Sequence, residues 1–164
     1  MEIGKPYPYR NIIAHYEQCL DTYGDSFRGV DWPNEQDAQT RYKVMMDLPG
    51  SKTGKDISIL DFGCGTAHML EFIHKQAYAE HIQYTGLDIS GKYIEVARNK
   101  FPGNRFIMMD ILEDAIGPGQ FDYVIMNGVF TEKRELSFDE MWNYLQDMLV
   151  RVFQYAEHGM AFNV

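Results

Sequence analysis

The sequence predicts a doubly wound α/β fold of three layers, in which about five parallel strands form one sheet between two helical layers. From Lys55 onward, short apolar runs alternate with helix-like segments, the pattern of βαβ units and a parallel sheet. The first of these runs leads into a Gly-x-Gly turn that opens a helix. A length of 164 residues, 45% hydrophobic and 24% charged, fits one globular domain.

The N-terminal part is rich in tyrosine, proline and polar residues, and it contains two helix-like stretches. The first runs from Asn11 to Tyr23, where apolar residues recur at helical spacing and Gly24 follows. The second begins after Asn34, which can cap it, and places Ala38, Tyr42 and Met45 on one face. We expect residues 1–50 to form a helical lid and residues 51–164 to form the main unit, within one structural domain.

The main unit is predicted to alternate strands and helices. Strands are expected at 57–60, 82–87, 105–109, 121–126 and 160–164, and helices at 67–78, 90–100 and 137–156. The last helix has the clearest start, because Ser137 and Glu140 form a capping box and Leu136 with Met141 can form a hydrophobic staple. We expect its apolar face, which runs from Phe138 to Phe153, to pack against the sheet, with a dimerisation face as the alternative.

The glycine turn after the first strand is the most informative segment. It reads Asp61-Phe-Gly63-Cys64-Gly65. In doubly wound folds, ligands bind outside the carboxyl ends of the strands, and glycines let the backbone approach them closely. His68 stands where a dinucleotide fingerprint needs its third glycine, and Asp61 would repel a pyrophosphate, so NAD and FAD are disfavoured. The glycines at 50–54 only imitate a phosphate-binding loop and are interpreted as a linker.

Polar residues close the other strands as well. Asp88 lies 23 residues beyond Gly65, about the spacing at which a carboxylate receives ribose hydroxyls in nucleotide-binding βαβ units. Asp110 ends the third strand and could accept a hydrogen bond from an adenine amino group. The fourth strand ends at Asn127 and Gly128, which face the same crevice. Together these strand ends predict a ligand site lined by carboxylates.

These segments resemble the class I S-adenosylmethionine-dependent methyltransferases of the small-molecule type. The resemblance rests on ILDFGCGTAHML, GLDIS, RFIMMDILE and FDYVIMNGVF, and covers about residues 55–164. It implies a Rossmann-like sheet that binds S-adenosylmethionine and releases S-adenosylhomocysteine. The cofactor contacts that it implies are Gly63, Cys64 and Gly65 at the amino-acid part, with Asp61 anchoring the loop, Asp88 and Ile89 at the ribose, Asp110 and Ile111 at the adenine, and Asn127 and Gly128 near the methionine end.

Two lid residues are added to this site. Arg41 could pair with the cofactor carboxylate, and Trp32 could line the sulfonium by a cation–π contact. The reaction implied is an in-line methyl transfer to an unidentified acceptor, expected to be a small molecule. No catalytic base is singled out, and no metal is expected because the five histidines show no ligand spacing.

Two other functions are alternatives to methyl transfer. A short-chain NAD-dependent oxidoreductase is disfavoured by the missing third glycine and by the lack of a Tyr-x-x-x-Lys pair after the fourth strand. A catalytically incomplete cofactor-binding or scaffolding subunit remains open, because the family sheet continues with a helix and an antiparallel hairpin whereas this sequence stops at Val164. We therefore expect the final strands to be absent, by truncation or because a partner chain completes the sheet.

Charge and composition set expectations for partners and location. A net charge of −9 argues against nucleic acid and anionic membrane surfaces. An uncovered fifth strand could support a homodimer. The sequence has no apolar run of about 18 residues and no secretory signal, and two distant cysteines fit a reduced, cytoplasmic setting.

Overall fold

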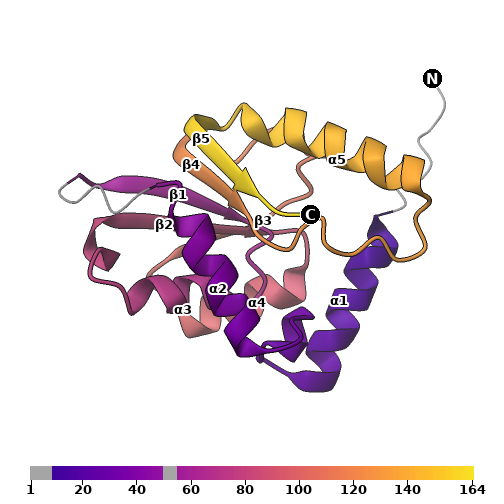
Figure 1. The fold of residues 1–164 in the computed structure, drawn as a ribbon, viewed down its shortest axis with the longest axis horizontal. Coiled ribbons are helices and arrows are strands. Elements are labelled where there is room, and N and C mark those ends of the chain that lie inside the picture. The colour runs from indigo at the N-terminus through magenta and orange to yellow at the C-terminus, as the bar shows by residue number, and fades with distance from the viewer. Residues whose placement is uncertain (1–8, 50–54) are drawn as a thin grey trace.

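A five-stranded parallel sheet forms the centre of the molecule (Figure 1). The structure is a computed structural model that describes residues 9–49 and 55–164. The strand order is β3-β2-β1-β4-β5, and every pair of neighbours is parallel. The chain winds outward in both directions from β1, so a switch point lies between β1 and β4. The strands are β1 (Ile57–Phe62), β2 (Ile82–Asp88), β3 (Arg105–Met108), β4 (Phe121–Met126) and β5 (Ala156–Phe162).

Helices cover both faces of this sheet, which confirms the three-layer α/β class. Successive strand residues point to opposite faces, so Ile59 joins the core cluster under α2, α3 and α4 while Leu60 joins the cluster under α5. Among the described residues, no helix is both long and apolar enough to cross a membrane. The helices are α1 (Arg10–Tyr23), η1 (Arg28–Val30), α2 (Glu35–Met46), α3 (His68–His74), η2 (Ala79–His81), α4 (Gly91–Lys100) and α5 (Phe138–Phe153).

The chain near the last strand differs from the sequence prediction. Helix α5 ends at Phe153, not at 156, and β5 spans Ala156–Phe162 where 160–164 was expected. Ala156 already pairs with Phe121 of β4. Residues 157–159 are Glu, His and Gly, which masked the start of the strand. Because β5 pairs with β4 alone among the described strands, it needs no continuous apolar run.

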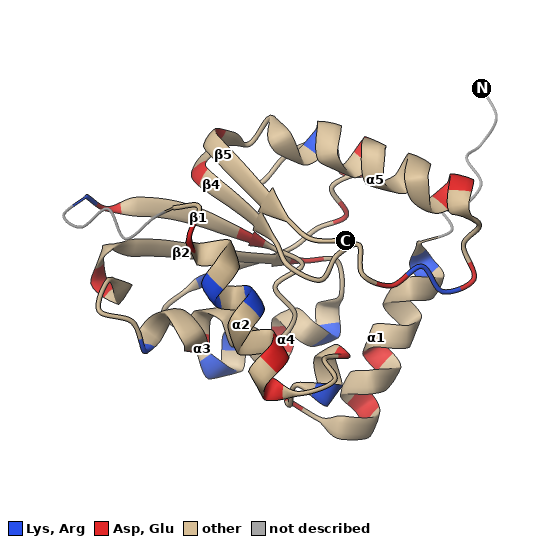
Figure 2. Cartoon of the chain, in the orientation of Figure 1, with Lys and Arg blue, Asp and Glu red and all other residues tan. Residues whose placement is uncertain are grey.

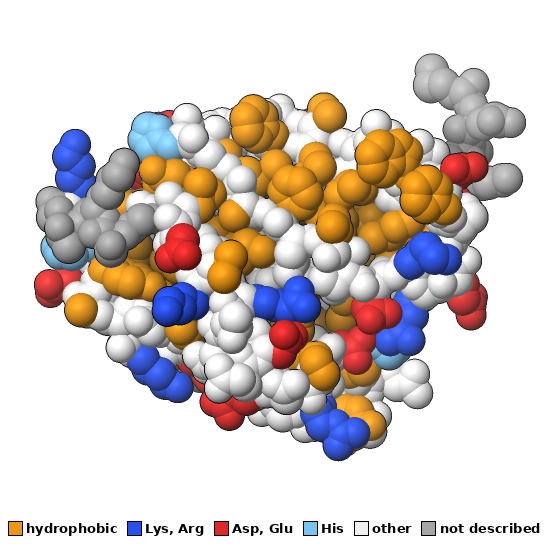
Figure 3. Space-filling view, in the orientation of Figure 1, with side chains coloured by type: hydrophobic (Ala, Val, Ile, Leu, Met, Phe, Trp, Pro, Cys, Tyr) orange, Lys and Arg blue, Asp and Glu red, His pale blue; other side chains and the backbone are white. Residues whose placement is uncertain are grey.

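The outer surface of α5 is more exposed than predicted. Its capping box is present, and Leu136 and Met141 pack in one cluster. Of the predicted apolar face, however, Phe138, Trp142 and Phe153 are 74%, 49% and 59% exposed. Figure 3 shows hydrophobic side chains gathered over α5 and β5. The prediction that this whole face packs against the sheet is therefore wrong for its outer residues.

The two N-terminal helices take different places. Helix α2 belongs to the core beside α3, where Ala38, Tyr42 and Met45 are buried. Helix α1 stands away from the sheet and packs on α4 and on the segment before α5 (Figure 1). Cover over the carboxyl ends of the strands therefore comes from α1 and the segment around η1. The glycines at 50 and 54 lie outside the described residues.

Helix α3 is shorter than the expected 67–78. Ala67 precedes it in a left-handed conformation, with φ of 66°, and the helix ends at His74. Turns and the 3-10 helix η2 fill the remainder before β2. The short helix still places His68, its first residue, directly behind the glycine turn.

Candidate active site

A cavity of about 150 Å³ lies at the carboxyl ends of β1 to β4, under α1 and the η1 segment. All but one of the site residues predicted from the sequence line it. The lid contributes Trp32 and the strand ends contribute the others. Those that line the cavity are Trp32, Asp61, Gly63, Cys64, Gly65, Asp88, Ile89, Asp110, Ile111, Asn127 and Gly128.

Arg41 is the exception and corrects the predicted set. Its guanidinium pairs with Asp37 one helical turn away, at 3.1 Å, and stacks 5.0 Å from the Trp32 ring centroid. Arg28 likewise stacks on Tyr23, at 4.3 Å. Neither arginine lines the cavity. Arg41 can therefore influence the site only through the position of Trp32.

The glycine turn lines the cavity and is hydrogen-bonded to β2. Gly63 and Gly65 have φ of 77° and 54°, a region that favours glycine. The backbone N–H groups of Gly63 and Cys64 donate to the Leu87 carbonyl of β2, at 2.7 and 3.0 Å. A Cβ on Gly63 would lie 2.7 Å from a methyl of Val129. The turn therefore requires glycine for both conformation and space.

Asp88 closes β2 and is buried beside this turn. Its Oδ2 accepts a hydrogen bond from the Gly65 N–H and its Oδ1 accepts from the Ser90 N–H, both at 2.9 Å. Burial raises the pKa of Asp88 to about 6, although the backbone hydrogen bonds act in the opposite direction. Each carboxylate oxygen has more than one lone pair, so Asp88 can still receive two hydroxyls from a ligand.

Asp61, on β1, is the second buried carboxyl of the cavity. The Tyr84 hydroxyl donates to its Oδ2 at 2.6 Å, and the side chain is only 3% exposed. Burial raises the pKa of Asp61 to about 7, and the nearby charge of Asp88 adds to the rise. Asp61 is therefore partly protonated near neutral pH, and a cation that approaches it favours its ionised form.

Asp110 binds a lid residue that sequence analysis missed. The Tyr9 hydroxyl lies 2.9 and 2.8 Å from its two oxygens. Burial, and then the hydrogen bond to Asp110, raise the pKa of Tyr9, so it remains a phenol. The contact spans 101 residues of sequence. No local pattern around Tyr9 could have signalled it.

The lid is fastened to α4 on one side of the cavity. The Tyr93 hydroxyl contacts the carbonyl oxygens of Tyr16 and Gly29, at 2.7 and 2.8 Å. The Ser90 hydroxyl donates to Glu17 at 2.6 Å. These hydrogen bonds tie both α1 and η1 to the strand-end region that carries Asp88.

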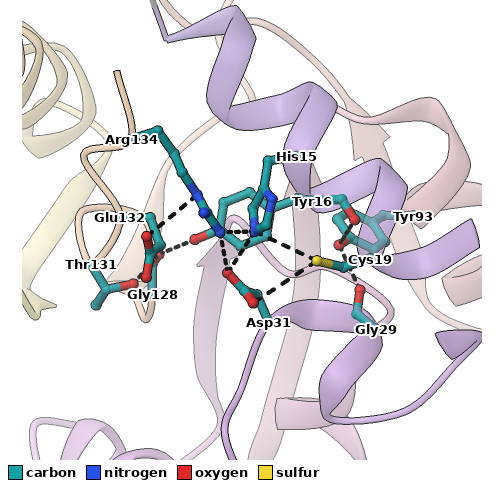
Figure 4. A network of polar contacts seen from close by, with 10 residues as sticks. All are labelled: His15, Tyr16, Cys19, Gly29, Asp31, Tyr93, Gly128, Thr131, Glu132 and Arg134. Atoms are coloured by element: carbon teal, nitrogen blue, oxygen red, sulfur yellow. Dashed lines mark hydrogen bonds and ion pairs between the residues drawn. The ribbon is translucent and has the colours of Figure 1, made fainter. Parts of the chain in front are cut away.

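An ionic bridge fastens the lid to the segment after β4 on the other side (Figure 4). The Arg134 guanidinium contacts the His15 ring and lies 3.1 Å from Asp31 Oδ2. His15 Nε2 lies 2.8 Å from the same carboxylate. Cys19 completes a group of possible metal ligands with His15 and Asp31, whose atoms all lie within 4.8 Å of one another. Here a guanidinium supplies the positive charge facing His15 and Asp31.

The hydroxyl groups of Tyr16 and Thr131 lie near the end of β4 (Figure 4), and both residues line the cavity. Thr131 donates to the Gly128 carbonyl at 3.0 Å, and Tyr16 contacts the same carbonyl at 3.4 Å. Burial raises the pKa of Tyr16 to about 12, so it stays neutral. Asn163 Oδ1 accepts a hydrogen bond from the Gly128 N–H at 2.8 Å, and Asn163 Nδ2 donates one to Asn127 Oδ1 at 2.9 Å.

The charge of the cavity wall is one-sided. Asp31, Asp61, Asp88 and Asp110 line it, whereas no described lysine or arginine does. Lysines and arginines lie mainly on the surrounding helices and loops (Figure 2). A phosphate needs positive charge or free backbone N–H groups, so the wall disfavours nucleotides with phosphates. It suits a ligand that carries hydroxyls, amino groups and positive charge.

Comparison with known proteins identifies the family of the chain. Residues 59–148 match the model of a family described as a methyltransferase domain. Ubiquinone/menaquinone biosynthesis C-methyltransferases of Campylobacter jejuni are 29% identical over 99 residues, which cover 58% of this chain and 41% of the relative. The chain thus spans less than half the length of the curated relatives it matches.

Solved structures share the fold at low sequence identity. Magnesium protoporphyrin IX methyltransferase from Synechocystis PCC 6803, with bound S-adenosylmethionine, is 18% identical with a TM-score of 0.60 and covers 96% of this chain and 75% of that one. The N-methyltransferase NodS from Bradyrhizobium japonicum WM9, in complex with S-adenosylhomocysteine, is 18% identical with a TM-score of 0.61 and covers 91% and 70%. The family match spans more than half of the chain and includes the glycine turn and the strand-end carboxylates. The chain therefore belongs to the family described as a methyltransferase domain, and it shares its fold with S-adenosylmethionine-dependent methyltransferases of known structure.

Proposed function

We propose that this chain binds S-adenosylmethionine in the cavity and transfers its methyl group to a small-molecule acceptor. The observation that carries the proposal is a cavity wall with four carboxyl groups and no described lysine or arginine, at the carboxyl ends of β1 to β4. S-adenosylmethionine has no phosphate and carries a sulfonium, an ammonium, two ribose hydroxyls and an adenine amino group. The donors of the cofactor thus match the acceptors of the wall.

Each strand end has a part in this proposal. Asp88 receives the ribose hydroxyls, and Asp110 with Ile111 borders the adenine. Gly63 and Gly65 let the backbone approach the amino-acid part, with Asp61 behind them. The end of β4 and the Trp32 ring surround the sulfonium. A Cβ added to Gly128 would lie 3.1 Å from that ring, so the indole packs directly on this strand end.

The cofactor, when bound, supplies an electrophilic methyl carbon. A lone pair of the acceptor forms the new bond to that carbon while the carbon–sulfur bond breaks, its electron pair stays on sulfur, and the acceptor releases a proton to solvent. The protein contributes position and a water-poor environment. The hydroxyls of Tyr16 and Thr131 are placed to orient an acceptor at the end of β4. We assign no catalytic base, because an amine or an acidic hydroxyl needs none.

A small acceptor fits the way in which the lid is fastened. Hydrogen bonds to α4 hold one side and the Arg134 bridge holds the other, which leaves little room for a macromolecule. The net charge of −9 supports the exclusion of nucleic acid and anionic membranes. Cys19 and Cys64 are both free and buried, which supports a reducing, cytoplasmic location.

The first experiment is calorimetric titration with S-adenosylmethionine, S-adenosylhomocysteine and NAD. We expect the first two to bind and NAD not to bind. Asp88→Asn should weaken both about tenfold or more, because charge-assisted hydrogen bonds are lost. Asp122→Asn is the matched control, since Asp122 lies at the opposite end of β4 and binds Ser58. Binding of NAD alone, or of none of the three, would overturn the proposal.

Turnover separates an enzyme from a binding subunit. Transfer of a labelled methyl group is measured with small amines, phenols and thiols as acceptors, on this chain and on a chain extended beyond Val164. Transfer to any acceptor supports the enzyme. Cofactor binding without transfer by either chain would favour the cofactor-binding or scaffolding subunit.

A further inference from the structure

The ionic bridge between the lid and the segment after β4 brings a histidine and a cysteine to the same carboxylate (Figure 4). His15 Nε2 lies 2.8 Å from Asp31 Oδ2 and 3.5 Å from Cys19 Sγ, and this sulfur lies 3.9 Å from Asp31 Oδ1. Imidazole nitrogen, thiolate sulfur and carboxylate oxygen are the three kinds of protein ligand that zinc takes. Helix α1 and the residue after η1 therefore bring three zinc donors to one point.

A proton cannot satisfy all the contacts of His15. Its Nε2 atom faces the carboxylate of Asp31, which only accepts, and the guanidinium of Arg134, which only donates. In a neutral ring this nitrogen carries either a proton or a lone pair, so one of the two contacts is mismatched. A doubly protonated ring would suit Asp31 but would place two positive groups in contact. A metal ion removes the conflict, because nitrogen, sulfur and oxygen would all direct lone pairs to one cation.

The distances fit a tetrahedral ion after small side-chain movements. Ligand bonds of about 2.0–2.3 Å at tetrahedral angles place nitrogen and oxygen about 3.4 Å apart, and sulfur about 3.6 Å from either. Each observed separation lies within about 0.6 Å of these values. His15 and Cys19 are one helical turn apart, so α1 holds their side chains on the same face. The backbone thus already places the donors, and only side-chain rotation is required.

An ion can reach these donors from solvent. The side chains of His15 and Asp31 are 25% and 28% exposed. His15 and Arg134 line a second, open cleft, and Asp31 also lines the main cavity. The donors can therefore be approached without unfolding of the lid.

Charge balance allows an ion to replace the guanidinium. Without a metal, Arg134 neutralises Asp31, and Cys19 keeps its proton, as free thiols mostly do near neutral pH. When the sulfur–metal bond forms, the thiol proton goes to solvent, so one doubly charged cation faces one carboxylate and one thiolate. The cluster then stays neutral without Arg134. A second partner is in place for Arg134, because its Nε lies 3.4 Å from Glu132 Oε2.

We propose that His15, Cys19 and Asp31 form a binding site for a zinc-class divalent cation, which displaces the Arg134 guanidinium. Water takes the fourth position of the tetrahedron. The imidazole and thiolate donors select zinc over magnesium and calcium, which take oxygen ligands. A bound ion joins α1 to the end of η1 and releases the bridge to the segment after β4. The inference goes beyond the proposed function and needs no bound cofactor. It departs from the prediction of no metal, which rested on the spacing of the histidines alone.

Titration with zinc and with cobalt tests this site. The chain is reduced and stripped of metal, and calorimetry measures its affinity for zinc. Cobalt is the spectroscopic probe, since its visible absorption reports tetrahedral coordination and its near-ultraviolet absorption reports a bond to thiolate. His15→Ala, Cys19→Ser and Asp31→Asn each remove one donor. Circular dichroism and thermal melting verify that each variant folds.

Two further variants sharpen the test. Arg134→Gln removes the competing cation, so zinc should bind this variant about fivefold more tightly than the unaltered chain. His158→Ala is the matched control, because His158 belongs to a separate group of possible ligands with Asp122 and Glu157. This control should leave the affinity for zinc within about twofold.

We expect the unaltered chain to bind one zinc ion and to show the thiolate band with cobalt. Each donor variant should weaken zinc by more than about tenfold, since the loss of an outer-shell partner already costs that much, and Cys19→Ser should remove the band. No zinc binding, or equal binding by the unaltered chain and all three donor variants, overturns the site. Unchanged affinity in Arg134→Gln overturns the displacement of the guanidinium.

Discussion

Replacing Asp61 by asparagine should stabilise the ligand-free protein, and this gain over the unaltered protein should grow as the pH rises. Asp61 is buried and its pKa is raised from 3.8 to about 7. In the unfolded chain the carboxyl ionises near 3.8, so between about pH 4 and pH 7 the folded chain binds more protons than the unfolded chain. Its stability therefore falls as the pH rises through this window and levels off above pH 7.

The size of the effect follows from the shift. A rise of about three pKa units at 1.36 kcal/mol per unit corresponds to about 4 kcal/mol, an order-of-magnitude figure. Roughly two-thirds of it, about 3 kcal/mol, develops between pH 5 and pH 8. Asparagine has no charge to bury and its carbonyl oxygen can still accept from the Tyr84 hydroxyl, which lies 2.6 Å from Asp61.

Urea unfolding at pH 5 and pH 8 measures this difference. The stability of Asp61→Asn relative to the unaltered protein should grow by about 3 kcal/mol over that interval. Asp122→Asn is the control, because hydrogen bonds from the Ser58 N–H and hydroxyl lower the pKa of Asp122 and place its titration below pH 5. Its relative stability should not change from pH 5 to pH 8. A flat profile for Asp61→Asn would refute the reasoning.

Three further changes test the fold around the site. Gly63→Ala should lower the free energy of unfolding in urea by about 2 kcal/mol, because alanine is strained at a φ of 77° and its Cβ would lie 2.7 Å from Val129. Gly103→Ala is the control: the space around Gly103 is open, so the free energy of unfolding should change by no more than about 0.5 kcal/mol. Ser137→Ala removes the capping box of α5 and should cost about 1 kcal/mol in the same assay. We expect two copies of the chain to associate through the exposed face of α5 and the β5 edge, and Trp142→Glu to abolish this in sedimentation velocity. A monomeric unaltered chain would contradict that expectation.

The fold class could be predicted because its signals are local. Strands β1, β2 and β4 are buried on both faces and show as short apolar runs, and Ser90 and Ser137 mark helix starts by capping. Strand β5 could not be placed well, since an edge strand has no such run. The exposure of Phe138 and Trp142 was also hidden, because periodicity shows that a helix has an apolar face and not how much of it is covered.

The candidate site was likewise predictable only in part: its strand-end residues could be found from the sequence, and its lid contacts could not. Residues at strand ends are brought together by the topology of a parallel sheet, so Asp61, Asp88 and Asn127 could be grouped from the sequence. Lid contacts depend on how α1 docks, and Tyr9 reaches Asp110 over 101 residues of sequence. Arg41 was chosen for its charge, although Asp37 stands one turn earlier in the same predicted helix, and this i,i+4 pairing holds Arg41 away from the cavity.

The burial that raises the pKa of Asp61 and Asp88 also links stability to ligand choice. Because these two buried carboxyl groups resist ionisation, they lower the free energy of unfolding of the ligand-free protein near pH 8. The Asp61→Asn experiment measures the part of this loss that is due to Asp61. A cation that enters the pocket favours their charged forms and recovers part of that cost. A phosphate would raise the cost further. In the proposed function, this energetic disadvantage of the free protein is the physical basis on which the chain selects a sulfonium cofactor over a nucleotide.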